Sequence, residues 1–229
     1  MGLGVEDRVR MAKRAAKEIT PGMCVNLGIG IPTLVADYIP EDWKVMFHAE
    51  NGIVGAGRKP FAGEEDENLC NAGGFPITIR KGGVYFDSAT AFAIVRKQML
   101  DMTILGGLEV SERGDLANWI VPGKRVPGMG GAMDLAVKAK KLVVLLSHTD
   151  NQGNPKIVNE CKLPLTASRC VHLIITEMAV IEVTSSGLVL HETLGNYSVE
   201  EVIERTGCPL TIPPDFKNSK SYEEGANDE

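Results

Sequence analysis

The chain has 229 residues, 44% of them hydrophobic, so it is long enough to bury a sizeable core within one domain. Its net charge of −6 and the lack of a basic cluster argue against nucleic acid as a main partner. No apolar run approaches the roughly 20 residues of a membrane-spanning helix, so we expect no membrane partner. The absence of a secretory signal pattern and five scattered cysteines without metal-ligand spacing indicate a cytoplasmic protein with reduced thiols.

The first quarter of the chain alternates between helical and strand patterns. Apolar residues at helical spacing predict a helix over residues 6–19, which the Thr-Pro-Gly turn at 20–22 ends. The sequence "MCVNLGIG" then predicts a buried strand that runs into a glycine turn, and a short helix follows over 32–38. "KVMFHAE" predicts the next strand. This alternation predicts an α/β fold with a mostly parallel open sheet flanked by helices.

The middle of the chain continues the same alternation. The segment 75–86, "FPITIRKGGVYF", predicts a hairpin around its Gly-Gly pair. Ser88 is suited to cap a helix that runs to about Leu100. A strand ending in glycines follows over 101–110, and a long glycine- and proline-rich loop precedes a helix over 132–140.

The last third of the chain predicts the centre and one side of the sheet. "LVVLLSH" predicts a strongly apolar central strand, and residues 171–193 predict two or three short strands around a Ser-Ser-Gly turn. Ser198 and Glu201 form a capping box at the start of a helix that Gly207 ends. We find no repeat and no linker, so we expect one domain over residues 1–212 and a disordered polar tail over 213–229.

Glycine-rich turns follow or precede several of these elements. The turn at 26–32 contains Gly-x-Gly but lacks the third glycine and the later acidic residue of a dinucleotide site, and the sequence has no phosphate-binding GxxxxGK[ST] motif. Gly128, Gly130 and Gly131 stand directly before a predicted helix, where free backbone N–H groups favour a phosphate or a developing oxyanion. A tight turn packed against a neighbouring helix explains this spacing equally well.

The stretch "MFHAENGIVGAG", residues 46–57, places a lone carboxylate, Glu50, at the end of a buried strand. Burying an unpaired charge is costly, so Glu50 is an ion-pair partner, a turn cap or a catalytic group. Parallel sheets hold their sites at the carboxyl ends of strands, which favours catalysis. The histidines stand apart in the sequence and form no metal-ligand pair, so we predict no metal site and structural roles for His48, His148, His172 and His191.

The sequence "FHAENGIVGAG" resembles the active-site signature of family I coenzyme A transferases, in their B (beta) subunit. It matches at Phe47, His48 and from Glu50 to Gly55, and departs at Ala49, where the family usually has serine. The segments "NLGIGIP", "GDLANWIVPGK", "GMGGAMDLA", "LPLT" and "IITEMAVIEV" also resemble the family, in the same order. The resemblance implies the coenzyme A transferase fold, and the likeness is greatest to B subunits that act on acetoacetate or similar short 3-oxo acids.

The resemblance also implies a reaction, namely transfer of coenzyme A, a sulfur-containing group. Glu50 would attack a short-chain acyl-CoA, and a covalent glutamyl-CoA thioester would then pass coenzyme A to a carboxylic acid with ping-pong kinetics. Backbone groups of Gly128, Gly130 and Gly131 would stabilise the oxyanion. Coenzyme A is a substrate here, and no metal or other cofactor is implied. We expect contacts with substrate or coenzyme A at Asn26, Gly28, Gly30, Asn51, Gly52, Lys124, Met129 and Ala132.

The family's A subunit is expected as a separate chain, with the site at the A–B interface of an A2B2 heterotetramer. Two other functions stay open on the sequence. One is an acyl-CoA hydrolase, in which water takes the intermediate, and the other is a non-catalytic ligand-binding or sugar-phosphate-isomerase-like protein. The sequence also leaves open the acyl donor and acceptor, the identity of the A subunit, the oligomeric state of the isolated chain and the effect of Ala49.

Overall fold

A computed structural model describes residues 3–123, 128–214 and 216. In the first half of the chain its elements are α1 (Val5–Ala16), β1 (Cys24–Leu27), η1 (Ile31–Tyr38), η2 (Glu41–Trp43), β2 (Met46–Ala49), β3 (Ile53–Ala56), β4 (Ile79–Tyr85), α2 (Ser88–Arg96), β5 (Met102–Gly106) and β6 (Glu109–Ser111). In the second half they are β7 (Leu116–Ala117), α3 (Ala132–Lys138), β8 (Leu142–Leu145), β9 (Ile157–Val158), β10 (Leu173–Ile175), β11 (Ala179–Thr184), β12 (Gly187–Thr193), α4 (Val199–Arg205) and β13 (Leu210–Thr211).

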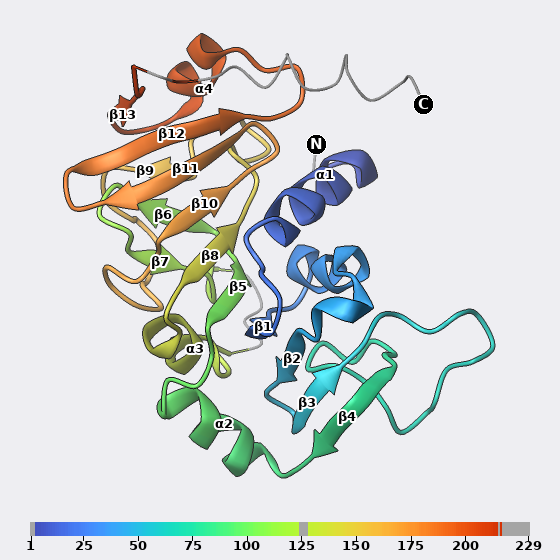
Figure 1. Cartoon of the computed structure of the whole chain (residues 1–229). Helices are drawn as coiled ribbons and strands as arrows, with labels where there is room; N and C mark the ends of the chain where they lie inside the picture. The colour runs from blue at the N-terminus through green and yellow to red at the C-terminus, as the bar shows by residue number, and fades with distance from the viewer. Residues whose placement is uncertain (1–2, 124–127, 215, 217–229) are drawn as a thin grey trace, which may run out of the picture.

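One large sheet runs through the molecule in the order β13-β12-β11-β10-β8-β5-β1-β2-β3-β4, as Figure 1 shows. Its centre, from β10 to β2, is parallel throughout. Antiparallel pairs extend it on both sides, with β11 and β12 beyond β10 and with β3 and β4 beyond β2. The predicted α/β fold with a mostly parallel sheet is confirmed, and a second small sheet joins β7, β6 and β9.

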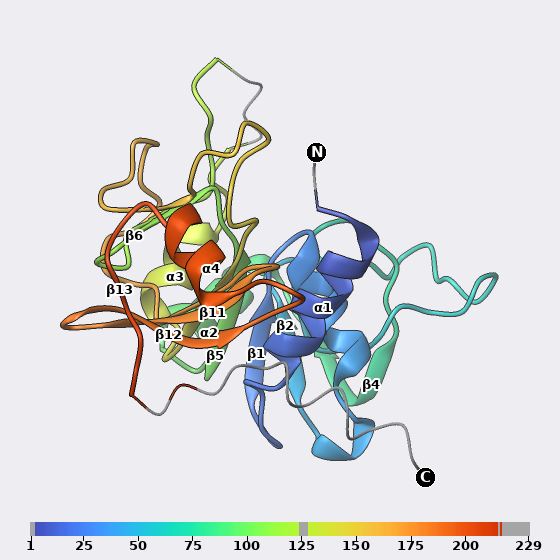
Figure 2. The same cartoon turned by 90° about the horizontal axis from the view of Figure 1, so that it is seen from above.

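Helices cover both faces of the large sheet. On one face α1 and η1 pack together over a core that includes Met11, Val35 and Phe47. On the other face α2, α3 and α4 cover a second core that includes Val95, Leu135 and Val202. Figure 2, which looks down on the molecule, separates α1 from α3 and α4 by the strands. The sheet is therefore the middle layer of three.

The central strands show why the sheet is buried on both sides. In β8, Val143 and Leu145 belong to the core under α1, whereas Leu142 and Val144 belong to the core under α2 and α3. Successive side chains of a strand point to opposite faces, so a continuous apolar run is what a two-sided burial requires. The prediction of a central strand from "LVVLLSH" is confirmed.

Several local predictions are corrected by the structure. The short helix after Gly30 is a 3-10 helix, Ile31–Tyr38, with Pro32 near its start. Helix α2 is capped by Asp87 rather than Ser88, because the Asp87 carboxylate accepts a hydrogen bond from Thr90 N at 2.7 Å. The predicted strand over 101–110 is two strands, β5 and β6, in different sheets. The capping box of Ser198 and Glu201 is confirmed.

The predicted hairpin at the Gly-Gly pair is also wrong. Residues Ile79–Tyr85 form one strand, β4, that passes through both glycines and pairs with β3. A Cβ on Gly55 of β3 would lie 2.6 Å from the Cα of Gly83, so the two strands approach each other too closely for side chains at this point. Gly82 adopts φ of 86°, and the register shifts between Val54 and Ala56. The glycines mark a β-bulge rather than a turn.

The segment from Ile53 to Ala56 and the short strands β7, β9 and β13 were not predicted as strands. Most of the predicted polar tail, from 213 onward, and Lys124 lie outside the described residues. Within the described part of the chain, no helix is both long enough and apolar enough to cross a membrane.

Candidate active site

Glu50 stands where strand β2 ends and turns back into β3. Strand β2 runs parallel to β1, so Glu50 lies at the carboxyl edge of the parallel part of the sheet. The turn is tight, because Gly52 N donates to Ala49 O at 3.0 Å and Gly52 adopts φ of 119°. A Cβ on Gly52 would lie 2.1 Å from Phe86 O, so only glycine fits there. The hairpin therefore holds Glu50 in a fixed position, half-buried, at the sheet edge.

Asn26 of the neighbouring strand reaches Glu50 directly. Its Nδ2 lies 3.2 Å from Glu50 Oε2 and also 3.2 Å from the carbonyl oxygen of His48. Asn26 is 0% exposed, and its Oδ1 has no hydrogen-bond partner among the described residues. A buried amide that donates a hydrogen bond to a carboxylate fixes the orientation of that carboxylate.

His48 in turn fixes the orientation of Asn26. Its Nε2 lies 3.2 Å from the carbonyl oxygen of Ala91 in α2, and its Nδ1 lies 3.2 Å from Asn26 Nδ2. Because the carbonyl can only accept, the proton belongs on Nε2, which leaves Nδ1 as an acceptor for the amide. Burial lowers the pKa of His48, which favours the same neutral form, although Ala91 and Glu50 act in the opposite direction.

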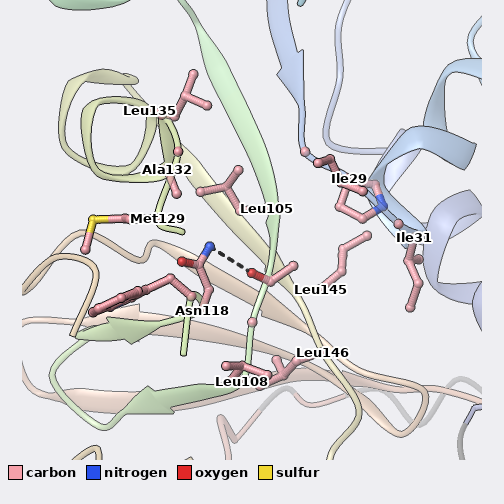
Figure 3. Close-up of a pocket in the computed structure, with 18 of the residues that line it drawn as sticks. Ile29, Ile31, Leu105, Leu108, Asn118, Met129, Ala132, Leu135, Leu145 and Leu146 are labelled. Carbon is pink, nitrogen blue, oxygen red and sulfur yellow. Dashed lines mark hydrogen bonds between the residues drawn. The ribbon is translucent and has the colours of Figure 1, made fainter. Parts of the chain in front are cut away.

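A cavity of about 760 Å³ opens beside Glu50 along the carboxyl ends of β1, β5 and β8. Its size lies within the range of about 300 to 1,000 Å³ that small-molecule sites occupy. Figure 3 shows apolar side chains on its walls, with Leu105 and Leu145 between Ile29 and Ile31 on one side and Ala132 and Leu135 of α3 on the other. Such walls offer apolar contacts to an acyl chain.

The glycine loop before α3 lines the same cavity. Gly128, Gly130 and Gly131 all face it, together with Met129 and Ala132. Gly128 and Gly130 have positive φ, 104° and 56°, and a Cβ on either would meet no atom within 4 Å. Gly131 is different, because its Cβ would lie 2.5 Å from the ring of Phe92. The loop packs tightly against α2 at Gly131, as expected for a tight turn, and stays open toward the cavity at Gly130, where an oxyanion role stays a prediction.

Most of the residues that were predicted from the sequence to contact substrate or coenzyme A lie together in the structure. Gly28, Gly30, Met129 and Ala132 line the cavity with Glu50, and Asn26 contacts Glu50 from behind. Two other predicted residues, Asn51 and Gly52, contact other parts of the chain instead. Asn51 Nδ2 donates to Cys70 O at 2.8 Å, in the loop beyond the hairpin, and Gly52 packs against Phe86.

Three polar residues of the cavity wall were not singled out from the sequence. Asn118 lines the cavity and its Nδ2 donates to Gly106 O at 3.2 Å, the bond drawn in Figure 3. Ser147 and Lys156 line it at the end of β8, and Lys156 Nζ donates to Ser147 Oγ at 3.0 Å. The rule that sites lie at strand ends could have found Ser147, which follows the central strand. Nothing local in the sequence pointed to Lys156.

Ala49, the departure from the family's serine, is 5% exposed and packs in the core under α1 and η1. His48 beside it points to the opposite face, toward α2. Because side chains alternate along a strand, the Ala49 methyl points away from the face on which His48 meets Asn26.

The molecule is therefore a three-layer α/β protein with a carboxylate at a strand end, backed by a buried amide and facing a cavity at the carboxyl edge of the sheet, where proteins of this class hold their sites. Residues 8–205 match the family model described as coenzyme A transferase. The chain is 56% identical over 216 residues to a probable coenzyme A transferase subunit beta of Bacillus subtilis, covering 94% of this chain and 100% of that one.

Two further relatives are longer than this chain. This chain is 47% identical over 212 residues to the mouse mitochondrial succinyl-CoA:3-ketoacid coenzyme A transferase 2B, and the match covers 92% of this chain but 41% of the relative. A crystal structure of an acyl-CoA transferase from Escherichia coli O157:H7 superposes with a TM-score of 0.74 at 22% identity, over 95% of this chain and 44% of that one. This last likeness shows the fold alone.

The chain therefore belongs to the coenzyme A transferase family. Within it the chain corresponds to the B, or beta, subunit, because the likeness spans the whole of a beta subunit and 41% of the longer mouse relative.

Proposed function

We propose that this B subunit moves coenzyme A between a short-chain acyl-CoA and a carboxylic acid, and that Glu50 is the nucleophile. The observation that carries the proposal is the environment of the Glu50 carboxylate. It lines an apolar cavity, and the fully buried amide of Asn26 lies 3.2 Å from its Oε2. A carboxylate is a weak nucleophile, so it needs this kind of fixed orientation and partial desolvation.

The reaction proceeds by substitution at carbonyl carbons. Glu50 attacks the acyl-CoA carbonyl, the C–S bond breaks, and an acyl-glutamyl anhydride and a coenzyme A thiolate form. The thiolate attacks the Glu50 carbonyl carbon and releases the first carboxylate, which leaves a glutamyl-CoA thioester. A second carboxylate reverses both steps and departs as the new acyl-CoA. No electrons are exchanged with a cofactor, and this sequence calls for no metal.

The other residues position the reacting groups. Asn26 orients the carboxylate, and backbone N–H groups of Gly128, Gly130 and Gly131 stabilise the tetrahedral oxyanions. The turn at Gly28 and Gly30 lets the substrate approach the sheet edge. Met129 and Ala132 contact the substrate, whereas Asn51, Gly52 and Lys124 are retained as weaker candidates for contacts with coenzyme A.

The relatives support a proposal for the substrate class and for the assembly. A 3-oxo acid such as acetoacetate is the favoured acceptor, because the mouse relative is named for a 3-ketoacid and succinyl-CoA. A separate A subunit completes the enzyme, because this chain spans 41% of that relative and all of a beta subunit. We propose an A2B2 heterotetramer with the site between the subunits, in the cytoplasm.

The test replaces Glu50 in the complete complex with its A subunit. Glu50→Gln keeps the size of the side chain and removes the nucleophile, so transfer should fall by at least about 1,000-fold. Glu64→Gln, an exposed loop residue, is the matched control and should keep full activity. Near-normal turnover of Glu50→Gln would refute the mechanism.

The covalent intermediate can be trapped as well. Borohydride should inactivate enzyme that has been preloaded with acyl-CoA, because it reduces the thioester, and mass spectrometry should find the change on Glu50. Reduction at another residue would overturn the assignment. Loss of acyl-CoA at the same rate with and without an added carboxylic acid would instead identify the enzyme as a hydrolase.

A further inference from the structure

The cavity has a second polar end, which the reaction at Glu50 does not use. Lys156 and Ser147 line it at the carboxyl end of β8, whereas Glu50 follows β2. Strands β1 and β5 lie between them in the sheet. Three spacings of about 4.8 Å put the ends of β2 and β8 roughly 14 Å apart. A ligand that reacts at Glu50 therefore meets Lys156 only through a part remote from the reacting carbon.

Lys156 is a cation without a direct ion-pair partner among the described residues, whose salt bridges do not include it. The polar contact of its Nζ in this part of the structure is the hydroxyl of Ser147, at 3.0 Å. An ammonium has three donors, so this bond leaves two of them for a ligand. The side chain is half-buried, and its stem is held against the protein.

Three carboxylates influence Lys156 without contacting it. Burial lowers the pKa of Lys156, and Glu177, Asp150 and Glu109 counteract that effect by favouring the charged form. The oxygens of each carboxylate accept hydrogen bonds from the backbone: Glu177 from His148 N, Asp150 from Gln152 N, and Glu109 from Lys162 N. The carboxylates therefore favour the charged form of the lysine, while the hydrogen bonds that they accept come from the backbone of the surrounding loops.

Leu105, Leu108, Leu145 and Leu146, labelled in Figure 3, make much of the cavity wall apolar, and Asn118 adds a polar side chain to it. A charge inside such a wall is costly unless a counter-charge meets it. Arg8 of α1 also lines the cavity, and it is the other lysine or arginine among the described lining residues.

We propose that Lys156, oriented by Ser147, binds an anionic group of the substrate at the end of the cavity remote from Glu50. The inference rests on the proposed function in one respect, that the acyl group reacts at Glu50. The anion is a carboxylate or a phosphate, and two parts of the substrate can supply it: the terminal carboxylate of a dicarboxylic acyl group, or a phosphate of coenzyme A. The surrounding carboxylates weaken the positive potential, so the subsite contributes a moderate factor to affinity, about tenfold.

The experiment uses the complete complex with the A subunit and four variants. Lys156→Met keeps the stem and removes the charge, Lys156→Arg restores a cation, and Arg8→Met removes the other cation. Lys162→Met, at an exposed position, is the matched control. Melting temperatures identify any variant that is misfolded. Lys156→Arg should bring KM back toward the wild-type value, because it restores the positive charge.

Two substrate pairs identify the source of the anion. Succinyl-CoA and butyryl-CoA share a four-carbon acyl chain and differ in a terminal carboxylate. Butyryl-CoA and butyryl-pantetheine differ in the phosphates. In the pair that differs in the anion bound by Lys156, Lys156→Met should raise KM about tenfold for the substrate that carries this anion and should not raise it for the other. Because Lys156 is remote from the reacting atoms, kcat should change less than twofold. Equal effects on all three substrates, no effect on any, or the same effect from Arg8→Met or Lys162→Met would overturn the proposal.

Direct binding separates this inference from the mechanism at Glu50. Calorimetric titration of the Glu50→Gln complex with coenzyme A and with succinate needs no chemistry at residue 50. Adding Lys156→Met to that complex should weaken binding of one of the two ligands about tenfold. Unchanged affinity for both would refute the subsite, even if Glu50 proves to be the nucleophile. Weakened affinity would support the subsite even if Glu50 proves not to be.

Discussion

The side-chain amide of Asn26 lies 3.2 Å from the carboxylate of Glu50, although Asn26 belongs to β1 and Glu50 follows β2. The parallel register of β1 and β2 pairs Asn26 with His48, two residues before Glu50. The same nitrogen lies 3.2 Å from His48 Nδ1, and His48 Nε2 reaches the Ala91 carbonyl of α2. A buried chain of polar groups therefore runs from a helix, through two strands, to the proposed nucleophile.

Asn26→Asp should lower kcat by about 10- to 100-fold. The substitution removes the amide donor from Glu50 and places a second carboxyl group 3.2 Å from it, and a hydrogen bond to a charged group is worth about 1.5 to 3 kcal/mol. Turnover of the complex with the A subunit measures the effect. Asn68→Asp makes the same chemical change at an exposed site and should leave turnover unaltered. A fully active Asn26→Asp enzyme would show that the contact does not matter to the reaction.

His48 should act as a positioning residue, because it contacts Asn26 and the backbone of α2. His48→Leu should lower kcat about tenfold with little change in KM, since the amide loses the acceptor that orients it. His48→Gln, whose amide can both accept and donate, should recover most of that loss. If both variants lose melting temperature and activity in parallel, His48 serves the fold alone.

Gly130→Ala should reduce turnover more than it reduces stability. The residue has φ of 56° and open space around its Cβ position, so alanine adds about 1 kcal/mol of backbone strain and a methyl group near the cavity. Gly22→Ala is the matched control, because Gly22 has φ of 82°, equally open space and no place in the cavity wall. Both variants should lose similar melting temperature, and Gly130→Ala alone should lose activity. Equal activities would favour a purely structural turn.

His148 should make stability fall as the pH is lowered from about 6.5 to about 4. Burial lowers its pKa to about 4, so the folded state binds fewer protons than the unfolded state within this window. Thr176 and Thr206 hydroxyls bond both ring nitrogens at 3.0 Å, which suits the neutral ring. The loss should reach about 3 kcal/mol below pH 4.

Denaturant unfolding of the wild type and of His148→Gln at a series of pH values measures this effect. The variant should be less stable at pH 7 and should lose less stability on acidification. Glu177, whose pKa burial raises, acts in the opposite sense and is present in both proteins, so the difference between the two curves belongs to His148. Parallel curves would mean that folding does not change the pKa of His148.

The boundaries and partners of the strands were the part of the fold that the sequence could not supply. Residues Ile53–Ala56 follow Glu50 so closely that their glycine pattern indicated a turn, yet they form β3. The Gly-Gly pair in β4 indicated a hairpin, because local rules do not see that Gly55 of another strand lies against Gly83. Close approach between strands is a property of the pairing, and glycine serves it as readily as it serves a turn.

The sequence by itself determined the layered α/β architecture, through its alternation of helical and strand patterns, and it singled out Glu50, through the cost of a charge at the end of an apolar strand. Only the tertiary structure decided which groups surround that carboxylate. Asn26 and the loop at Gly130 come from distant segments, and Lys156 reaches the same cavity from beyond the central strand. Chemical patterns are local to the chain, whereas contacts depend on strand order and register, which long-range packing selects.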